Sequence, residues 1–205
     1  MAKRYNQVYQ FRIELRDIEP KIWRVIQVPE TYTFWDFHVA IQDAMGWLDC
    51  HLHEFTVTDP ITRKKVIIGT PTEEEEGFFI EETIPGWKVM IADGFSKRNK
   101  KAYYCYDFGD DWQHIIKLEK ILPKDKEQIY PRCIAGERAC PPEDCGSTPG
   151  YEEIVDMLKN PEPDNEEYQE MMKWLGGSYG PEYFDSSEIF FDDPEERLKT
   201  FFEFH

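Results

Sequence analysis

Hydrophobic residues recur at two different spacings along this chain, and the change between them constrains the fold more than any other feature. From residue 9 to 16, the apolar side chains of Tyr9, Phe11, Ile13 and Leu15 alternate with polar ones. A period of two over eight residues is typical of a strand with one buried face. After residue 150 the apolar residues recur at helical spacing instead. This order predicts an α+β fold with a mostly antiparallel sheet and a helical C-terminal segment.

Further segments extend the predicted sheet. Residues 22–28 are apolar on both faces apart from two positions, which indicates a more central strand paired with the first. Residues 103–108 and 112–118 flank Gly109-Asp110-Asp111, and glycine and aspartate are typical of a hairpin turn. Shorter strands are expected over residues 51–57, 66–68 and 78–80.

One helix is expected to pack on this sheet. Thr33 is its candidate N-cap, with Asp36 three residues on, and Gly46 is its candidate C-terminal stop. A short helix is expected within residues 87–95, and an acidic loop over residues 73–76.

The remainder of the chain is predicted to be loop and helices. A loop rich in proline, glycine and cysteine is expected over residues 131–150. The first helix after it is expected to be capped by Ser147 or Thr148, the second to open at Asp164 with a capping box, and the last to start at Asp193-Pro194. We interpret residues 1–205 as a single domain, in which a sheet-rich portion (1–135) precedes the loop and an acidic helical portion (136–205).

The net charge is −17, and it is unevenly distributed. Residues 151–205 carry 16 acidic and 4 basic side chains, a net charge of −12. Such a surface repels nucleic-acid phosphates and anionic membranes, so direct binding to either is disfavoured. A basic protein or a small ligand is the expected partner.

The expected location is the cytoplasm. The first residues include no apolar run of the kind found in secretory signals, and nowhere do 18 consecutive apolar residues occur. The five cysteines are an odd number, which fits a reducing compartment.

Several stretches resemble one known family in order over nearly the whole chain. The matching stretches are Pro20–Arg24, Ala44–Trp47, His51–Phe55, Tyr106–His114 and Gly136–Gly146. On these residues the chain resembles the plasmid pRiA4b open-reading-frame-three-like family. Ser147 stands where the family often has a second glycine, which affects only the shape of that turn.

The resemblance implies a fold but no established activity. Some members of that family carry a resolvase label. A serine recombinase needs a nucleophilic serine among arginines, and the first fifty residues of this chain contain no serine. The net negative charge also argues against that label.

Histidines and aspartates are the residues with the clearest chemical potential. His51 and His53 are two apart on a predicted strand, so their rings project to one face. His114 on the hairpin could join them beside an aspartate, and imidazoles with a carboxylate suit zinc or another transition metal. The alternative is that these histidines are hydrogen-bonded at the rim of the core.

Arg24 lies among apolar residues and is expected to pair with a carboxylate. Glu143 and Asp144 follow Pro141-Pro142 in a stiff loop, which we call the double-proline loop. These two acids could perform general acid–base work, but we favour a role for Glu143 in anchoring the loop by pairing with Arg24 or Arg138. We therefore expect one polar cluster, which is a candidate binding site or a buried network that stabilises the fold. Its members are Trp23, Arg24, Trp47, His51, His53, Tyr106, Asp107, Asp110, Trp112, His114, Glu143 and Asp144.

No complete catalytic constellation is identified, and no catalytic residue is assigned. The first hypothesis is therefore a non-catalytic binding or protein-interaction module with an aromatic and histidine cleft. The alternative is a metal-dependent enzyme, such as a hydrolase, using His51, His53, His114 and an aspartate, with a divalent metal as cofactor. The third is an accessory factor in mobile-element DNA transactions, and it rests only on the family label.

Overall fold

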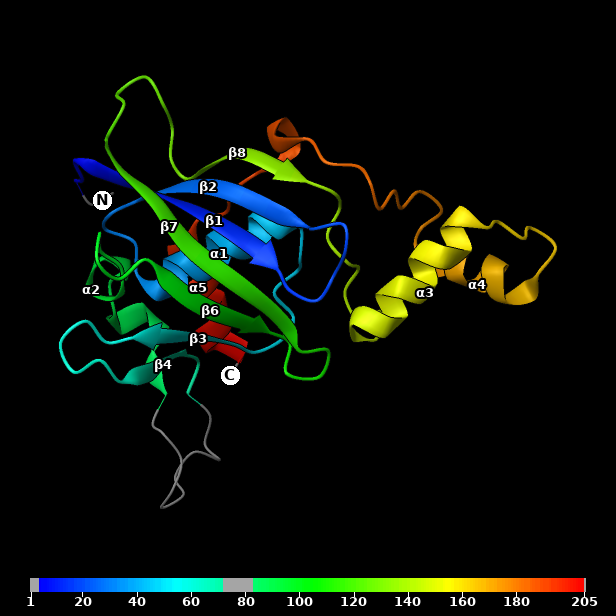
Figure 1. Ribbon diagram of the computed structural model, residues 1–205, viewed down its shortest axis with the longest axis horizontal. Coiled ribbons are helices and arrows are strands. Elements are labelled where there is room, and N and C mark those ends of the chain that lie inside the picture. The colour runs from blue at the N-terminus through cyan, green and yellow to red at the C-terminus, as the bar shows by residue number, and fades with distance from the viewer. Residues whose placement is uncertain (1–3, 72–82, 205) are drawn as a thin grey trace, which may run out of the picture.

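The protein, described here by a computed structural model over residues 4–71 and 83–204, is built on one curved sheet (Figure 1). Its strands are β1 (Gln7–Leu15), β2 (Trp23–Pro29), β3 (His53–Thr58), β4 (Lys65–Gly69), β5 (Ile84–Pro85), β6 (Lys101–Tyr106), β7 (Trp112–Pro123) and β8 (Arg132–Glu137). In the described residues they form an eight-stranded sheet of order β5-β4-β3-β6-β7-β1-β2-β8. All neighbouring pairs are antiparallel except β4 and β5.

The helices gather on one face of the sheet or project from it. They are α1 (Phe34–Met45), α2 (Ile91–Gly94), α3 (Ser147–Lys159), α4 (Glu166–Trp174) and α5 (Pro194–Phe204), with short 3₁₀ turns at Gly86–Lys88 and Ser186–Glu188. The predicted α+β class is thereby confirmed. No helix in the described part of the chain is long and apolar enough to cross a membrane.

The two strand pairs expected from alternation are present. Phe11 on β1 faces Ile26 on β2 across the antiparallel pair, and both side chains are buried. Tyr106 pairs with Trp112 across the predicted hairpin between β6 and β7. The turn contains Asp107 and Asp111 with φ of 56° and 54°, a conformation that aspartate adopts more readily than most residues.

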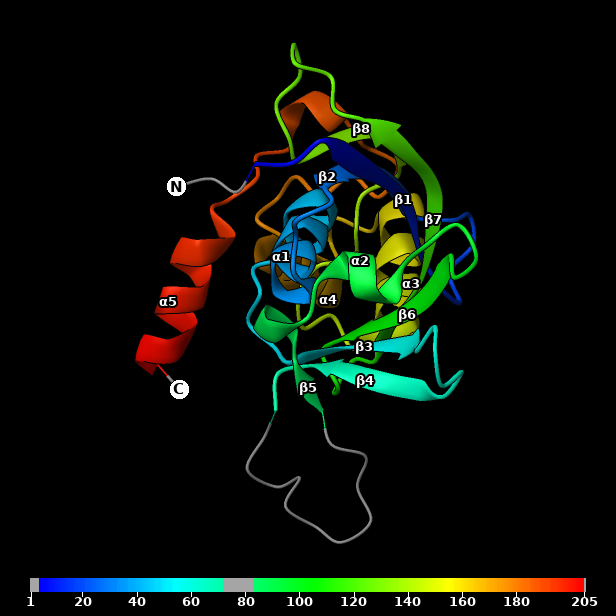
Figure 2. The same ribbon diagram turned by 90° about the vertical axis from the view of Figure 1, so that its left-hand side faces the viewer.

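Helix α1 is specified at both ends. The Thr33 hydroxyl accepts a hydrogen bond from Asp36 N (3.1 Å), and the Asp36 carboxylate accepts one from Thr33 N (2.9 Å). Gly46 ends the helix with φ of 93°. Figure 2 shows the sheet curving around α1, with α5 on the side of α1 that the sheet leaves open. Ten of the twelve residues of α1 are therefore buried, including the polar His38 and Gln42.

Several expected boundaries are wrong. Strand β8 lies inside the stretch expected to be loop. The alternation that predicts a strand is missing there, since the first five residues of β8 are half-buried and the last is exposed. Helix α3 is capped by Gly146, with φ of 87°, and α4 by Asn165. His51 precedes β3 rather than lying on it. The loop and strand expected at residues 73–76 and 78–80 lie outside the described residues.

Helices α3 and α4 project away from the sheet as an arm (Figure 1). Tyr151 and Val155 of α3 belong to the core cluster, whereas no residue of α4 is buried. The arm is therefore held at the end nearer the sheet.

Candidate functional site

A cleft of about 460 Å³ opens between α1, the segment 48–53 and α5, and we call it the α1–α5 cleft. Its lining residues are Trp35, 48–53, Thr70, Asp192, Arg197, Thr200 and Phe201. The rings of Trp35 and Phe201 contact each other, with centroids 5.5 Å apart. Aromatic walls with a few polar groups are typical of small-molecule sites.

Two buried histidines meet beside the cleft. The rings of His38 and His53 lie face to face, with centroids 3.4 Å apart and planes at 7°. His38 Nε2 lies 2.7 Å from Asp49 Oδ1, and His38 Nδ1 lies 2.8 Å from the hydroxyl of Tyr104. His53 Nε2 is buried without a hydrogen-bond partner in the described part of the chain. Burial, and then the proximity of His38, lower the pKa of His53 well below its ordinary value, so its ring is neutral at pH 7.

Arg197 links α5 to α1 and to the segment 48–53 through ion pairs. Its Nη2 contacts Asp43 Oδ1 at 2.9 Å and also pairs with Asp192, and its Nη1 lies 3.6 Å from Asp49 Oδ2. A second link is the hydrogen bond from Trp35 Nε1 to Pro194 O (3.0 Å). Three carboxylates around one guanidinium leave this wall of the cleft with a net negative charge.

The double-proline loop is hydrogen-bonded to residues 47 and 48 and to Tyr106. Glu143 Oε1 accepts hydrogen bonds from Leu48 N (2.7 Å) and from the Tyr106 hydroxyl (3.0 Å), and Trp47 Nε1 donates to Pro141 O (2.9 Å). Burial raises the pKa of Glu143. Glu143 thus holds the loop against the residues that lead into β3.

His51 contacts a different group of side chains from the buried histidine pair. Its Nε2 lies 3.0 Å from Asp144 Oδ1 and 3.6 Å from Asp107 Oδ2. Asp107 and Asp144 have φ of 56° and 54°. His51, Asp107 and Asp144 form a partly exposed group beside the turn between β6 and β7.

His114 is enclosed by aromatic rings. Its ring centroid lies 5.3 Å from that of Trp47, and its Nδ1 lies 3.3 Å from Tyr104 O. Burial lowers the pKa of His114 to about 4. Nearby, Trp47 contacts Trp112, with centroids 6.1 Å apart, and Asp110 accepts a hydrogen bond from Gly146 N.

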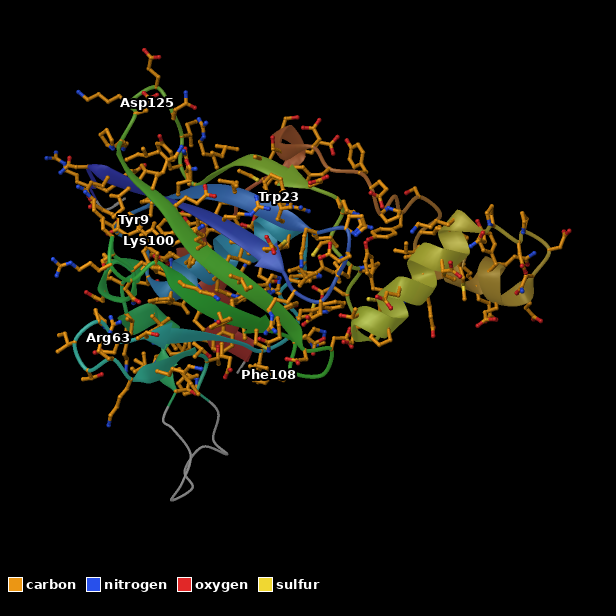
Figure 3. All side chains as sticks on the ribbon, in the orientation of Figure 1. Tyr9, Trp23, Arg63, Lys100, Phe108 and Asp125 are labelled. Atoms are coloured by element: carbon orange, nitrogen blue, oxygen red, sulfur yellow. The ribbon has the colours of Figure 1, made fainter. Side chains whose placement is uncertain are left out.

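Of the twelve expected site residues, eight are linked by contacts with one another and four are not. The linked residues are Trp47, His51, Tyr106, Asp107, Trp112, His114, Glu143 and Asp144. Asp110 accepts a hydrogen bond from Gly146 N instead. His53 joins His38 instead, and Trp23 and Arg24 lie on β2, beyond three intervening strands from β3. Figure 3 labels Trp23 on β2 and, far from it, Phe108 in the β6–β7 turn.

The expected ion pairs of Arg24 and Glu143 are wrong. The buried Arg24 guanidinium donates to the backbone carbonyls of Ala44 (2.8 Å), Trp23 (2.9 Å) and Glu137 (3.0 Å). Backbone oxygens therefore satisfy this buried cation. Arg138 pairs with Glu182 (2.9 Å) rather than with Glu143.

His51, His53 and His114, which the sequence offered as one alternative for a shared metal site, do not come together. Two groups of candidate ligands with mutually close ligand atoms occur in the described residues, His38-Asp49-His53 and His51-Asp107-Asp144, and His114 belongs to neither. His38, Asp49 and Arg197 were not singled out from the sequence. The available signal was a histidine inside an otherwise apolar helix face, since a buried imidazole needs polar partners.

Comparisons with known proteins identify relatives without a described function. The chain is 33% identical over 172 residues to the uncharacterized protein y4hQ of Sinorhizobium fredii, covering 83% of this chain and 82% of that protein. It is also similar to a crystal structure of a protein of unknown function, MM3350 from Methanosarcina mazei, with 43% identity and a TM-score of 0.82. That similarity covers 92% of this chain and 100% of the other. A family model matches residues 7–188, and the chain therefore belongs to the plasmid pRiA4b ORF-3-like protein family.

Proposed function

We propose that this protein binds a small organic ligand in the α1–α5 cleft. The observation that supports the proposal is the combination of about 460 Å³ of space, an aromatic wall and a few convergent polar groups. Ligand pockets typically have volumes of about 300–1,000 Å³ and this mixture of linings. The cleft therefore has the volume and the lining expected of a ligand site.

The lining favours a neutral or cationic ligand with a flat apolar part. Trp35 and Phe201 offer apolar ring surface, whereas Asp49 and Asp192 place negative charge at the opening. Arg197 also lines the cleft, but it is already paired with carboxylates. An anionic ligand would have to compete with those carboxylates.

The proposal is tested by blocking the cleft. Thr200 lies on α5, is exposed and lines the cleft, so Thr200→Trp should fill it without disturbing the core. The matched control is Lys199→Trp, which adds the same ring at an exposed position on the same helix that does not line the cleft. A library of small aromatic fragments is screened by saturation-transfer NMR on the full chain.

We expect a set of fragments that bind the wild type and Lys199→Trp but lose at least about tenfold in affinity for Thr200→Trp, about 1.4 kcal/mol. Fragments that bind all three proteins equally, or no binding at millimolar concentration, would contradict the proposal.

A metal-dependent enzyme is the second candidate function. The observation that favours it is the pair of imidazole and carboxylate groups at or near the cleft. Hydrolysis of ester, phosphoester and peptide probes by zinc- or manganese-loaded protein would distinguish catalysis from binding, because a chelator should abolish a metal-dependent rate.

A further inference from the structure

We infer that His38, Asp49 and His53 form a binding site for a divalent transition-metal ion beside the α1–α5 cleft. Each of the three residues offers a ligand atom, and these atoms all lie within 4.8 Å of one another. His53 and Asp49 also line the cleft. The inference deepens the proposed function, and it rests on that proposal only for the class of ligand.

The two imidazoles are stacked in this structure. Their rings lie face to face at 3.4 Å with planes at 7°, although aromatic rings prefer offset or edge-to-face packing. The lone pair of an imidazole nitrogen lies in the plane of its ring, so two parallel rings cannot direct their lone pairs at one ion. Binding one ion therefore requires a ring to rotate, and the stacking contact is exchanged for two metal–nitrogen bonds of about 2.0–2.1 Å.

The donor set selects the class of metal. Two imidazole nitrogens and one carboxylate suit zinc, iron(II) and similar ions, whereas calcium and magnesium prefer oxygen ligands. Metal ligation requires a neutral imidazole. His53 meets that requirement because it is buried and its Nε2 has no hydrogen-bond partner among the described residues.

The surroundings can orient His38 as a ligand. A metal-bound histidine usually holds its second ring nitrogen in a hydrogen bond. His38 Nδ1 lies 2.8 Å from the Tyr104 hydroxyl, which Gln42 Nε2 also contacts at 2.8 Å. His38 Nε2 lies 2.7 Å from Asp49 Oδ1, a hydrogen-bond distance, so an ion bound here would replace the proton between these two atoms while Nδ1 donates to the hydroxyl.

Local charge favours cation binding at His38, Asp49 and His53 over binding at the second group, His51, Asp107 and Asp144. Asp43, Asp49 and Asp192 surround the single guanidinium of Arg197, so the net charge beside the site is negative. In the other group, the side chains of His51 and Asp144 are 30% and 71% exposed. Solvent screens charges at that site, whereas His38 and His53 are enclosed.

Three protein ligands would leave at least one coordination position for a ligand in the cleft. The ligand class is then a small organic molecule with a metal-coordinating oxygen or nitrogen beside its apolar part. Such a group binds the ion directly and needs no pairing with Arg197.

Cobalt(II) and zinc(II) are the probes for the test, with the full chain stripped by a chelator. Asp49→Asn removes the carboxylate, and asparagine tolerates the left-handed backbone at this position, where φ is 59°. The matched control is Asp144→Asn, at a residue with φ of 54° beside His51 in the other group. Binding is followed by the visible absorption of bound cobalt and by elemental analysis after dialysis against zinc.

We expect about one equivalent of bound metal in the wild type, at least about tenfold weaker binding in Asp49→Asn, and less than about threefold change in Asp144→Asn. Less than about a tenth of an equivalent in the wild type would overturn the inference. So would binding that Asp144→Asn abolishes and Asp49→Asn preserves.

The two proposals fail separately. Fragments that bind the metal-free protein and are excluded by Thr200→Trp would support the cleft even if no metal binds. Metal binding with no fragment excluded by Thr200→Trp would support the metal site and overturn the proposed function.

Discussion

Histidine takes different chemical roles in this protein because its surroundings differ from one position to the next. His51 is half-exposed between two carboxylates, His53 is stacked on His38, and His114 is enclosed by aromatic rings. Desolvation disfavours the charged imidazole, so burial is the main cause of the lowered pKa of His53 and His114.

His114 should make stability depend on pH. Its pKa is about 4 in the folded protein and about 6.5 in the unfolded chain, so the unfolded chain binds more protons between those values. Its neutral form contributes fully above about pH 6.5, and we expect about 3 kcal/mol to be lost as the pH falls toward 4. The measurement is the free energy of urea unfolding at several pH values.

The comparison is with His114→Asn, whose amide can replace the Nδ1 hydrogen bond but does not titrate. This variant is expected to be less stable at pH 7 because of the cavity it creates, yet to show a shallower slope below pH 6.5. An unchanged slope would show that His114 is not the group responsible.

At the scale of elements, the double-proline loop shows how one carboxylate can position a segment. Glu143 holds Leu48 N and the Tyr106 hydroxyl through a single oxygen. Anchoring of the loop was predicted from the sequence, but the partners were not. They lie 95 and 37 residues away along the chain, and only the folded sheet brings them to the loop.

Two substitutions at Glu143 should separate its hydrogen bonds from its charge. Glu143→Ala leaves Leu48 N and the Tyr106 hydroxyl without their acceptor and is expected to cost about 1–3 kcal/mol. Glu143→Gln keeps an acceptor oxygen. Because burial raises the pKa of Glu143, the ionised carboxylate is disfavoured in the folded state, and this cost is present above the ordinary pKa of 4.5.

We therefore expect Glu143→Gln to be at least as stable as the wild type at pH 7, with the difference vanishing as the pH falls below about 4.5. Thermal and urea unfolding across this range are the measurements. Equal destabilisation by glutamine and alanine at pH 7 would mean that the charge itself is required.

In the whole molecule, the α1–α5 cleft forms because α5, the last helix in the chain, packs against α1. Trp35 Nε1 reaches Pro194 O across 159 residues of sequence, and Arg197 reaches Asp43 across 154. These contacts place Phe201 and Thr200 opposite the segment that precedes β3. Helix α5 therefore forms one wall of the candidate site.

Arg197→Met should release α5 without unfolding the sheet. It leaves Asp43 and Asp192 without their shared cation, and like charges then repel across the contact. We expect amide hydrogen exchange in residues 194–204 to accelerate at least about tenfold, while β1 and β7 keep their protection. Lys199→Met, on the exposed side of the same helix, is the control. Equal exchange in both variants would show that Arg197 does not hold the helix.

The elements with strong local signals could be predicted from the sequence alone. Alternation identified β1, a run apolar on both faces identified β2, a Gly-Asp-Asp turn identified the β6–β7 hairpin, and Thr33 and Gly46 bounded α1. Each of these depends on residues within a few positions of one another. Strand β8 lacked such a signal, because it is short, half-buried and without alternation.

The contacts between side chains depended on the tertiary fold. His51, His53 and His114 lie in three different surroundings, and His53 contacts His38 in a group with Asp49, which no local pattern connects. Arg24 donates hydrogen bonds to backbone carbonyls, where the sequence had suggested a carboxylate partner. The physical reason is that a buried polar group must be satisfied by whatever partner the packing of distant segments supplies, and spacing along the chain carries no information about that partner.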